Sequence, residues 1–214
     1  RSPADAELHA YLAGVAASAA VAGDYDNDGL PDLLVAGPGG VSLRHNEGGL
    51  RFTEERAPLP AFPHPVAAAA FVDIDHDGDL DVFVSAAAAA GPALLLQNNG
   101  DRTFADITAT AQLAVAGGAV AVVPTDFDNR RDVDLFVLKR DRPALFKNVR
   151  DGSFKDLAAE LSLLAPGPFR CAAAGDANKD GYTDFFLGAE GESSLPHSDG
   201  RGAFAVSPAP AAAA

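Results

Sequence analysis

Residues 24–32 read Asp-Tyr-Asp-Asn-Asp-Gly-Leu-Pro-Asp, and three further stretches of the chain follow the same pattern. In this first stretch, which we call loop one, three carboxylates alternate with other residues, a Gly allows a sharp bend, and a further Asp returns at the ninth position. The copies, called loops two, three and four, are residues 73–81, 126–134 and 176–184. Successive loops begin about 50 residues apart, a spacing that indicates a repeat architecture.

A second landmark keeps the same spacing. In each repeat an Asn or Ser stands six residues before a Phe. The four pairs are Asn46 and Phe52, Asn98 and Phe104, Asn148 and Phe154, and Ser198 and Phe204. Two landmarks in phase make chance repetition an unlikely explanation, so the chain is predicted to contain four copies of one structural unit.

Each unit is predicted to hold four short strands. An Ala/Val run precedes the acidic loop, a fully apolar run such as 82–84 follows it, and a tight turn such as Asn98-Asn-Gly-Asp reverses the chain into the strand that carries the Phe. Four antiparallel strands in about 50 residues make one propeller blade. Helical hairpins are excluded because no repeat contains an amphipathic stretch of ten residues.

The fold class is therefore predicted as all-β, a β-propeller of four-stranded antiparallel blades. We expect residues 1–214 to form a single propeller region, either a closed ring of four blades or part of a larger propeller. The expected blades are residues 16–57, 66–109, 118–159 and 169–207.

The acidic loops are predicted to bind Ca2+. This ion takes six to eight oxygen ligands, and a tight loop with side-chain oxygens at positions one, three, five and nine and a backbone carbonyl at position seven supplies most of them. Without a cation, so many carboxylates in nine residues would repel one another. The predicted ligands are Asp24, Asp26, Asp28, Leu30 and Asp32 in loop one; Asp73, Asp75, Asp77, Asp79 and Asp81 in loop two; and Asp176, Asn178, Asp180, Tyr182 and Asp184 in loop four.

Loop three departs from this pattern. Arg130 replaces the oxygen ligand at position five and Arg131 replaces the Gly at position six. A guanidinium can pair with the remaining carboxylates, so about three ions are expected and the loop from Asp126 to Asp134 is expected to hold none. An EF-hand is excluded because position twelve, where it needs a Glu, is Val or Leu in every copy.

These motifs resemble the FG-GAP/VCBS repeats of integrin α-subunit propellers and of bacterial ASPIC/UnbV, cartilage-acidic-protein-like proteins. The resemblance rests on loop one and its copies, and on residues 96–108, Leu-Gln-Asn-Asn-Gly-Asp-Arg-Thr-Phe-Ala-Asp-Ile-Thr. It implies a calcium-stabilised propeller used for binding, in a secreted, cell-surface or periplasmic protein. The Phe-Gly and Gly-Ala-Pro motifs that name the integrin repeats are missing, so integrin ligand recognition is not carried over.

Composition excludes several functions. Thirty acidic residues against sixteen Lys and Arg give a net charge of -14, which disfavours nucleic acid as a partner. No stretch approaches the roughly 20 apolar residues that span a bilayer, so membrane insertion is not expected. The single cysteine, Cys171, rules out an internal disulfide and is expected to be buried as a small apolar residue.

No motif of an enzyme is found, since the chain lacks a Gly-x-Ser-x-Gly elbow, a P-loop and a His-Glu-x-x-His zinc site. We therefore expect a non-catalytic module for protein interaction, adhesion or scaffolding. A lectin-like carbohydrate-binding propeller and an accessory domain of a polysaccharide-degrading enzyme remain as alternatives. The expected partner is a protein or a glycan, and the Pro-rich segment 58–65 with Phe62 and His64 is the candidate contact.

Overall fold

The chain forms four sheets of four strands each. The computed structural model describes residues 17–208 except 50, 56–58, 89–90, 114–117, 140–141, 158–166 and 201–202. Every regular element in this part of the chain is a strand, and no helix there is long and apolar enough to cross a membrane. The strands are β1 Ala19–Gly23, β2 Asp32–Gly37, β3 Gly40–Asn46, β4 Phe52–Glu55, β5 Val66–Val72, β6 Asp81–Ala86, β7 Ala93–Asn98, β8 Phe104–Asp106, β9 Ala119–Thr125, β10 Asp134–Lys139, β11 Ala144–Asn148, β12 Phe154–Asp156, β13 Phe169–Gly175, β14 Asp184–Ala189, β15 Ser194–Ser198 and β16 Phe204–Pro208.

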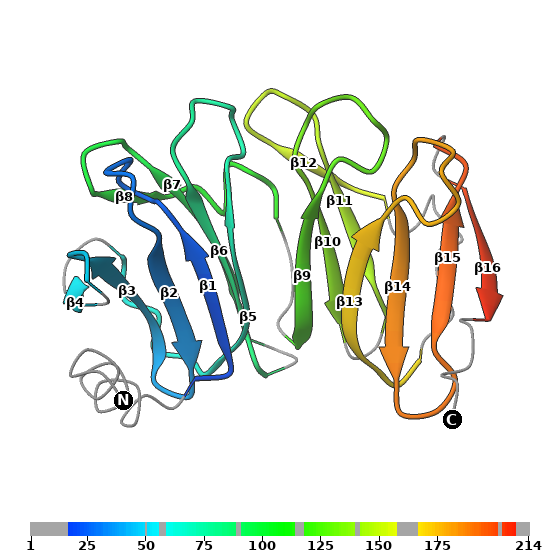
Figure 1. Cartoon of the computed structure of the whole chain (residues 1–214), viewed down its shortest axis with the longest axis horizontal. Helices are drawn as coiled ribbons and strands as arrows, with labels where there is room; N and C mark the ends of the chain where they lie inside the picture. Colours follow the sequence, from blue (N-terminus) through cyan, green and yellow to red (C-terminus); the bar gives the residue numbers. More distant parts are fainter. Residues whose placement is uncertain are drawn as a thin grey trace.

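Each sheet is an antiparallel meander in which consecutive strands pair, in the orders β1-β2-β3-β4, β5-β6-β7-β8, β9-β10-β11-β12 and β13-β14-β15-β16. These sheets are the four predicted blades, and the all-β propeller architecture is confirmed. The blades stand side by side in chain order (Figure 1). Blades one and four lie at opposite ends of this row, so the described blades do not close into a ring of four.

The core lies between the blades. Successive residues of a strand point to opposite faces, so the apolar second strand of a blade contributes to two interfaces. In β10, Leu135 and Val137 pack toward the second blade, whereas Phe136 stacks on Phe185 of the fourth blade with 4.1 Å between ring centroids. Three apolar clusters, one for each pair of neighbouring blades, hold the row together.

The Asn landmark joins neighbouring blades. Asn98 Nδ2 donates to the backbone carbonyl of Tyr25 in the preceding blade at 2.8 Å, and the Phe104 ring lies 6.2 Å from the Tyr25 ring. Asn148 Nδ2 donates in the same way to the Ile74 carbonyl at 2.8 Å. In blades two and three, the Asn landmark therefore docks the blade on the acidic loop of the blade before it.

The outer face of the fourth blade is uncovered. Phe186 occupies the strand position of Leu34, Phe83 and Phe136, which are fully buried beneath a following blade, but it is 39% exposed. Cys171 lies on an exposed part of β13 in the same blade, which corrects the expectation that it is buried. Both side chains are exposed because the described structure places no blade against this face.

The Pro-rich segment also differs from expectation. Phe62 is only 7% exposed and packs in the cluster between the first and second blades, where its ring meets His64 edge-on at 5.2 Å between centroids. His64 is exposed. Phe62 is therefore a core residue, and the idea that its ring contacts a partner is wrong because the ring faces the interior.

Candidate metal-binding loops

The four acidic loops connect the first and second strand of each blade and lie along one edge of the row, at the top of Figure 1. Position four of each loop has a left-handed backbone, with φ between 58° and 63°; these residues are Asn27, His76, Asn129 and Lys179. Position six is also left-handed, including Arg131 with φ 66° in place of Gly. Loop three therefore keeps the backbone bend of the other loops despite its different sequence.

The Asp at position nine clamps each loop to the rest of its blade. Asp81 accepts hydrogen bonds from the backbone N–H of Ile74 at 3.0 Å and of Asn98 at 2.7 Å. Asp32, Asp134 and Asp184 accept the equivalent pairs of backbone hydrogen bonds. Burial raises the pKa of Asp81 and of Asp134 to about 7, and it also raises that of Asp32. This carboxylate thus has a structural role beyond that of a predicted ligand.

The carboxylate at position five orders the residue at position seven. Asp28 accepts the backbone N–H of Leu30 at 2.8 Å, and the same contact joins Asp77 to Asp79 at 2.9 Å and Asp180 to Tyr182 at 2.9 Å. Loop three has Arg130 at position five, so no carboxylate is available there. The predicted ligand residues at positions five and seven are therefore held together in loops one, two and four.

The Asp at position one makes different hydrogen bonds in loop two than in the other three loops. Asp24, Asp126 and Asp176 each accept two backbone N–H groups from positions five and six of their own loops. Asp73 Oδ1, in contrast, is a buried oxygen with no hydrogen-bond partner. An unpartnered buried oxygen is costly, so a cation at loop two would satisfy it.

Carboxylates converge in three of the loops. Oxygen atoms within 4.8 Å of one another come from Asp24, Asp26 and Asp28 in loop one, from Asp73, Asp75 and Asp81 in loop two, and from Asp126, Asp128 and Asp134 in loop three. Loop four forms no such group of three, since its position three is Asn178, whose amide binds Asp180 at 2.8 Å. The oxygen-rich sets of loops one and two fit a hard cation such as Ca2+.

In loop three, cationic side chains approach the carboxylate at position three. Arg130 Nε lies 3.2 Å from Asp128 Oδ2, and the Lys147 ammonium pairs with the same oxygen. The role of Arg130 was predicted from the sequence, and that of Lys147 was not. The signal that could have found Lys147 is its place immediately before the Asn148 landmark, because this residue of the third strand points at the loop in every blade.

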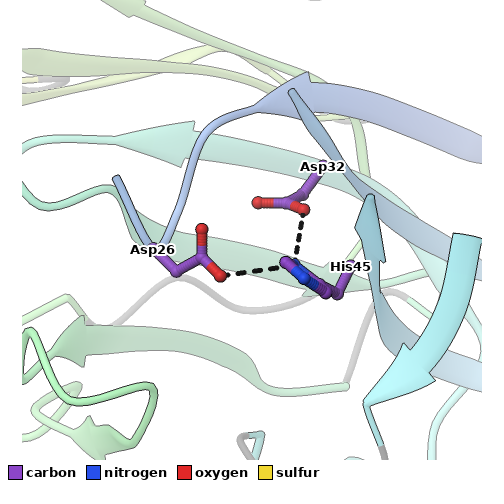
Figure 2. Close-up of side chains that lie close together, drawn as sticks. All are labelled: Asp26, Asp32 and His45. Atoms are coloured by element: carbon purple, nitrogen blue, oxygen red, sulfur yellow. Dashed lines mark ion pairs between the residues drawn. The ribbon is translucent and has the colours of Figure 1, made fainter. Parts of the chain in front are cut away.

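The same position carries a different side chain in each blade. In blade two, Gln97 Nε2 donates to Asp75 at 2.7 Å, and in blade four His197 Nδ1 lies 3.2 Å from Asp184. In blade one the residue is His45, whose Nδ1 lies 3.2 Å from both Asp26 Oδ2 and Asp32 Oδ1 (Figure 2). We call this residue, at 45, 97, 147 and 197, the loop-facing residue of the third strand.

A cavity of about 560 Å3 lies between blades two and three beside the acidic loops. Its lining includes His76, Asp132 and Arg150. Arg150 pairs with Asp132, and His76 Nε2 lies 3.8 Å from the same carboxylate. The cavity therefore joins apolar walls such as Ile107 to a charged rim.

The family model of the FG-GAP-like repeat matches residues 24–84 and 126–187, together more than half of the chain. The comparison with curated proteins gives no match.

Several solved structures are similar. One is the structure of an Agrocybe aegerita lectin that specifically recognises non-reducing terminal N-acetylglucosamine. It is 16% identical with a TM-score of 0.45, and the match covers 89% of this chain and 65% of that chain. BBS1N in complex with ARL6DN is 15% identical, with a TM-score of 0.46 over 90% of this chain and 70% of that chain. The Photorhabdus luminescens Tc holotoxin pore is 22% identical, with a TM-score of 0.41 over 88% of this chain and 9% of that chain. The chain thus spans less than two thirds of the lectin structure.

Proposed function

Because the chain belongs to the FG-GAP-like repeat family, we propose that it is a non-catalytic β-propeller module that calcium stabilises and that binds a protein ligand. The observation that carries the calcium part is the donor set of loop two. Three of its carboxylates converge, and the buried Asp73 Oδ1 has no partner. Ca2+ would offset the repulsion among these carboxylates and supply the missing partner.

Loops one, two and four are the proposed cation sites, with the ligands predicted from the sequence, and loop two is the proposed calcium site that the structure supports most directly. Loop three needs no ion in this proposal because Lys147 and Arg130 already neutralise Asp128. Extracellular calcium modules bind with dissociation constants of about 0.1 to 1 mM. Affinities in this range would fit a protein that acts outside the cytosol, as the resemblance to extracellular repeats also implies.

Binding rather than catalysis is proposed because the carboxylates of the loops already have structural partners. The acids at positions one and nine mostly accept backbone N–H groups, which keeps them fixed in the loop. The cavity between blades two and three is the proposed contact surface, in place of Phe62. The exposed Arg150 can exchange its pair with the buried Asp132 for an acidic group of a protein ligand.

The test is capture of partners from the native source on immobilised full-length chain. Wild-type protein should retain a partner in calcium and release it in EGTA. The variant Arg150→Glu should lose capture but keep the calcium-dependent rise in melting temperature. Lys155→Glu, at an exposed position of β12, serves as the matched control. Capture that survives Arg150→Glu would exclude this cavity, and binding to glycan arrays alone would replace the protein ligand with a carbohydrate.

A further inference from the structure

We propose that loop one, together with His45, forms a site for a divalent transition-metal ion of the Zn2+ type, held by Asp26, Asp32 and His45. The inference rests on the proposed role of the acidic loops as cation sites, and it assigns a different metal to one of them. The three side chains come from the loop and from the facing strand β3, and Figure 2 shows them converging.

His45 Nδ1 lies at metal-ligand spacing from two carboxylate oxygens. This atom lies 3.2 Å from Asp26 Oδ2 and 3.2 Å from Asp32 Oδ1. A ring nitrogen carries at most one proton, so it cannot make a full hydrogen bond to each oxygen, and it makes none to either. Ligands at about 2.0 to 2.1 Å from a tetrahedral Zn2+ stand roughly 3.3 Å from one another. The observed separations therefore suit three ligands of one small ion.

Two of the three converging atoms make no hydrogen bond. His45 Nδ1 and Asp26 Oδ2 are both buried without a hydrogen bond, and the Asp26 side chain is only 1% exposed. Asp26 Oδ2 has an ion pair with Arg102 instead. Asp32 is clamped by two backbone N–H groups, which fixes its orientation toward the ring. A buried polar atom without a hydrogen bond is costly, and a metal ion would satisfy His45 Nδ1 and take the place of Arg102 at Asp26 Oδ2.

Arg102 is the competing cation. It belongs to the β7–β8 turn of the neighbouring blade, and its Nη2 lies 2.6 Å from Asp26 Oδ2. Its side chain is half exposed and also approaches Glu55 at 4.0 Å, so it can move to Glu55 and solvent when an ion binds. Removing Arg102 should therefore tighten metal binding.

Loop two differs from loop one in the loop-facing residue of the third strand, which is Gln97 in place of His45. Its amide donates to Asp75 and offers no nitrogen lone pair to a metal. Ca2+ prefers oxygen ligands, whereas imidazole nitrogen favours Zn2+ and related ions. One substitution between two otherwise similar loops thus changes which ion is preferred.

The experiment titrates metal-free full-length chain with Zn2+ alone and with Ca2+ alone in a calorimeter. Wild-type protein should bind one Zn2+ tightly, and His45→Gln, which copies loop two, should weaken that binding by about tenfold or more. The reciprocal Gln97→His variant should add a second Zn2+ equivalent, and Arg102→Gln should tighten the first. His76→Gln is the control for adventitious binding by an exposed imidazole.

Substitution with Co2+ supplies an independent readout. A visible absorption band of a nitrogen-ligated ion should appear in wild-type protein and vanish in His45→Gln, while circular dichroism verifies that the variant keeps its strands. Absence of tight Zn2+ binding, or unchanged binding in His45→Gln, would overturn the proposal. Calcium binding at the other loops is read in the separate Ca2+ titration, so failure of the calcium proposal is distinguishable from failure of this one.

Discussion

Loops two and three have nearly the same backbone but satisfy their carboxylates differently. In loop two the Asp73 oxygen is buried without a partner, and the loop-facing residue is the neutral Gln97. In loop three Asp126 accepts two backbone N–H groups, and the loop-facing Lys147 pairs with Asp128. If loop two binds Ca2+ as proposed, one loop backbone serves either a bound ion or the internal cation Lys147, and the loop-facing residue of the third strand makes the difference.

Calcium removal should change the stability of the protein more than any substitution below. At a calcium concentration about 100 times the dissociation constant, each occupied site adds about 2.7 kcal/mol, or roughly 5 to 10 °C of melting temperature in a chain of this size. EGTA should therefore lower the melting temperature and expose residues 73–81 to proteolysis, while residues 126–134 stay protected. Equal cleavage of both loops, or no change on EGTA addition, would remove the distinction between them.

The next comparison removes the first ligand of each loop. Asp73→Ala deletes a calcium ligand and should abolish about 2 kcal/mol of calcium-dependent stabilisation. Asp126→Ala deletes two hydrogen bonds and should cost about 1 to 2 kcal/mol with or without calcium. Thermal melts of both variants in calcium and in EGTA measure the difference, and a calcium-dependent loss in Asp126→Ala would show that loop three also binds the ion.

Loops two and three can also be compared by giving loop three the side chains of loop two. The double variant Arg130→Asp, Lys147→Gln gives loop three the position-five carboxylate and the facing amide of loop two. It should raise the calcium stoichiometry by one in isothermal titration, with weaker binding than at loop two because Arg131 still replaces Gly. The reverse single variant Gln97→Lys should remove one equivalent. Unchanged stoichiometry in both would mean that the facing residue does not control occupancy.

The smallest expected effect is a pH dependence of the metal-free protein. Burial raises the pKa of Asp81 and of Asp134 to about 7 from the ordinary 3.8. The folded state therefore binds protons more tightly than the unfolded state, so this stabilisation is present at low pH and is lost as pH rises through about 7. In EGTA the melting temperature should rise as pH falls from 8 to 6.

Calcium should weaken or reverse this pH trend at loop two, because the ion favours the charged carboxylate. A melting temperature that falls with acidification in EGTA would contradict the raised pKa values of Asp81 and Asp134.

The propeller architecture and the acidic loops were predictable from the sequence because their signals are local. Runs such as 82–84 and turns such as 98–101 define strands and hairpins within a few residues. The loop-facing residue was not predictable in the same way. His45 meets Asp32 from thirteen positions away, and only the pairing of β2 with β3 puts Leu33 opposite Arg44 and thereby brings the ring to the loop.

Four blades and four acidic loops follow from the sequence alone, since period, turn residues and carboxylate spacing are properties of short segments. Which side chains surround those carboxylates, and which apolar residues are covered, depends on how the blades pack. Phe62 is buried and Phe186 is exposed because burial depends on whether a neighbouring blade packs on that face. Arg102 reaches Asp26 for the same reason: contacts between blades join residues far apart in the chain, whose proximity depends on how the blades stack.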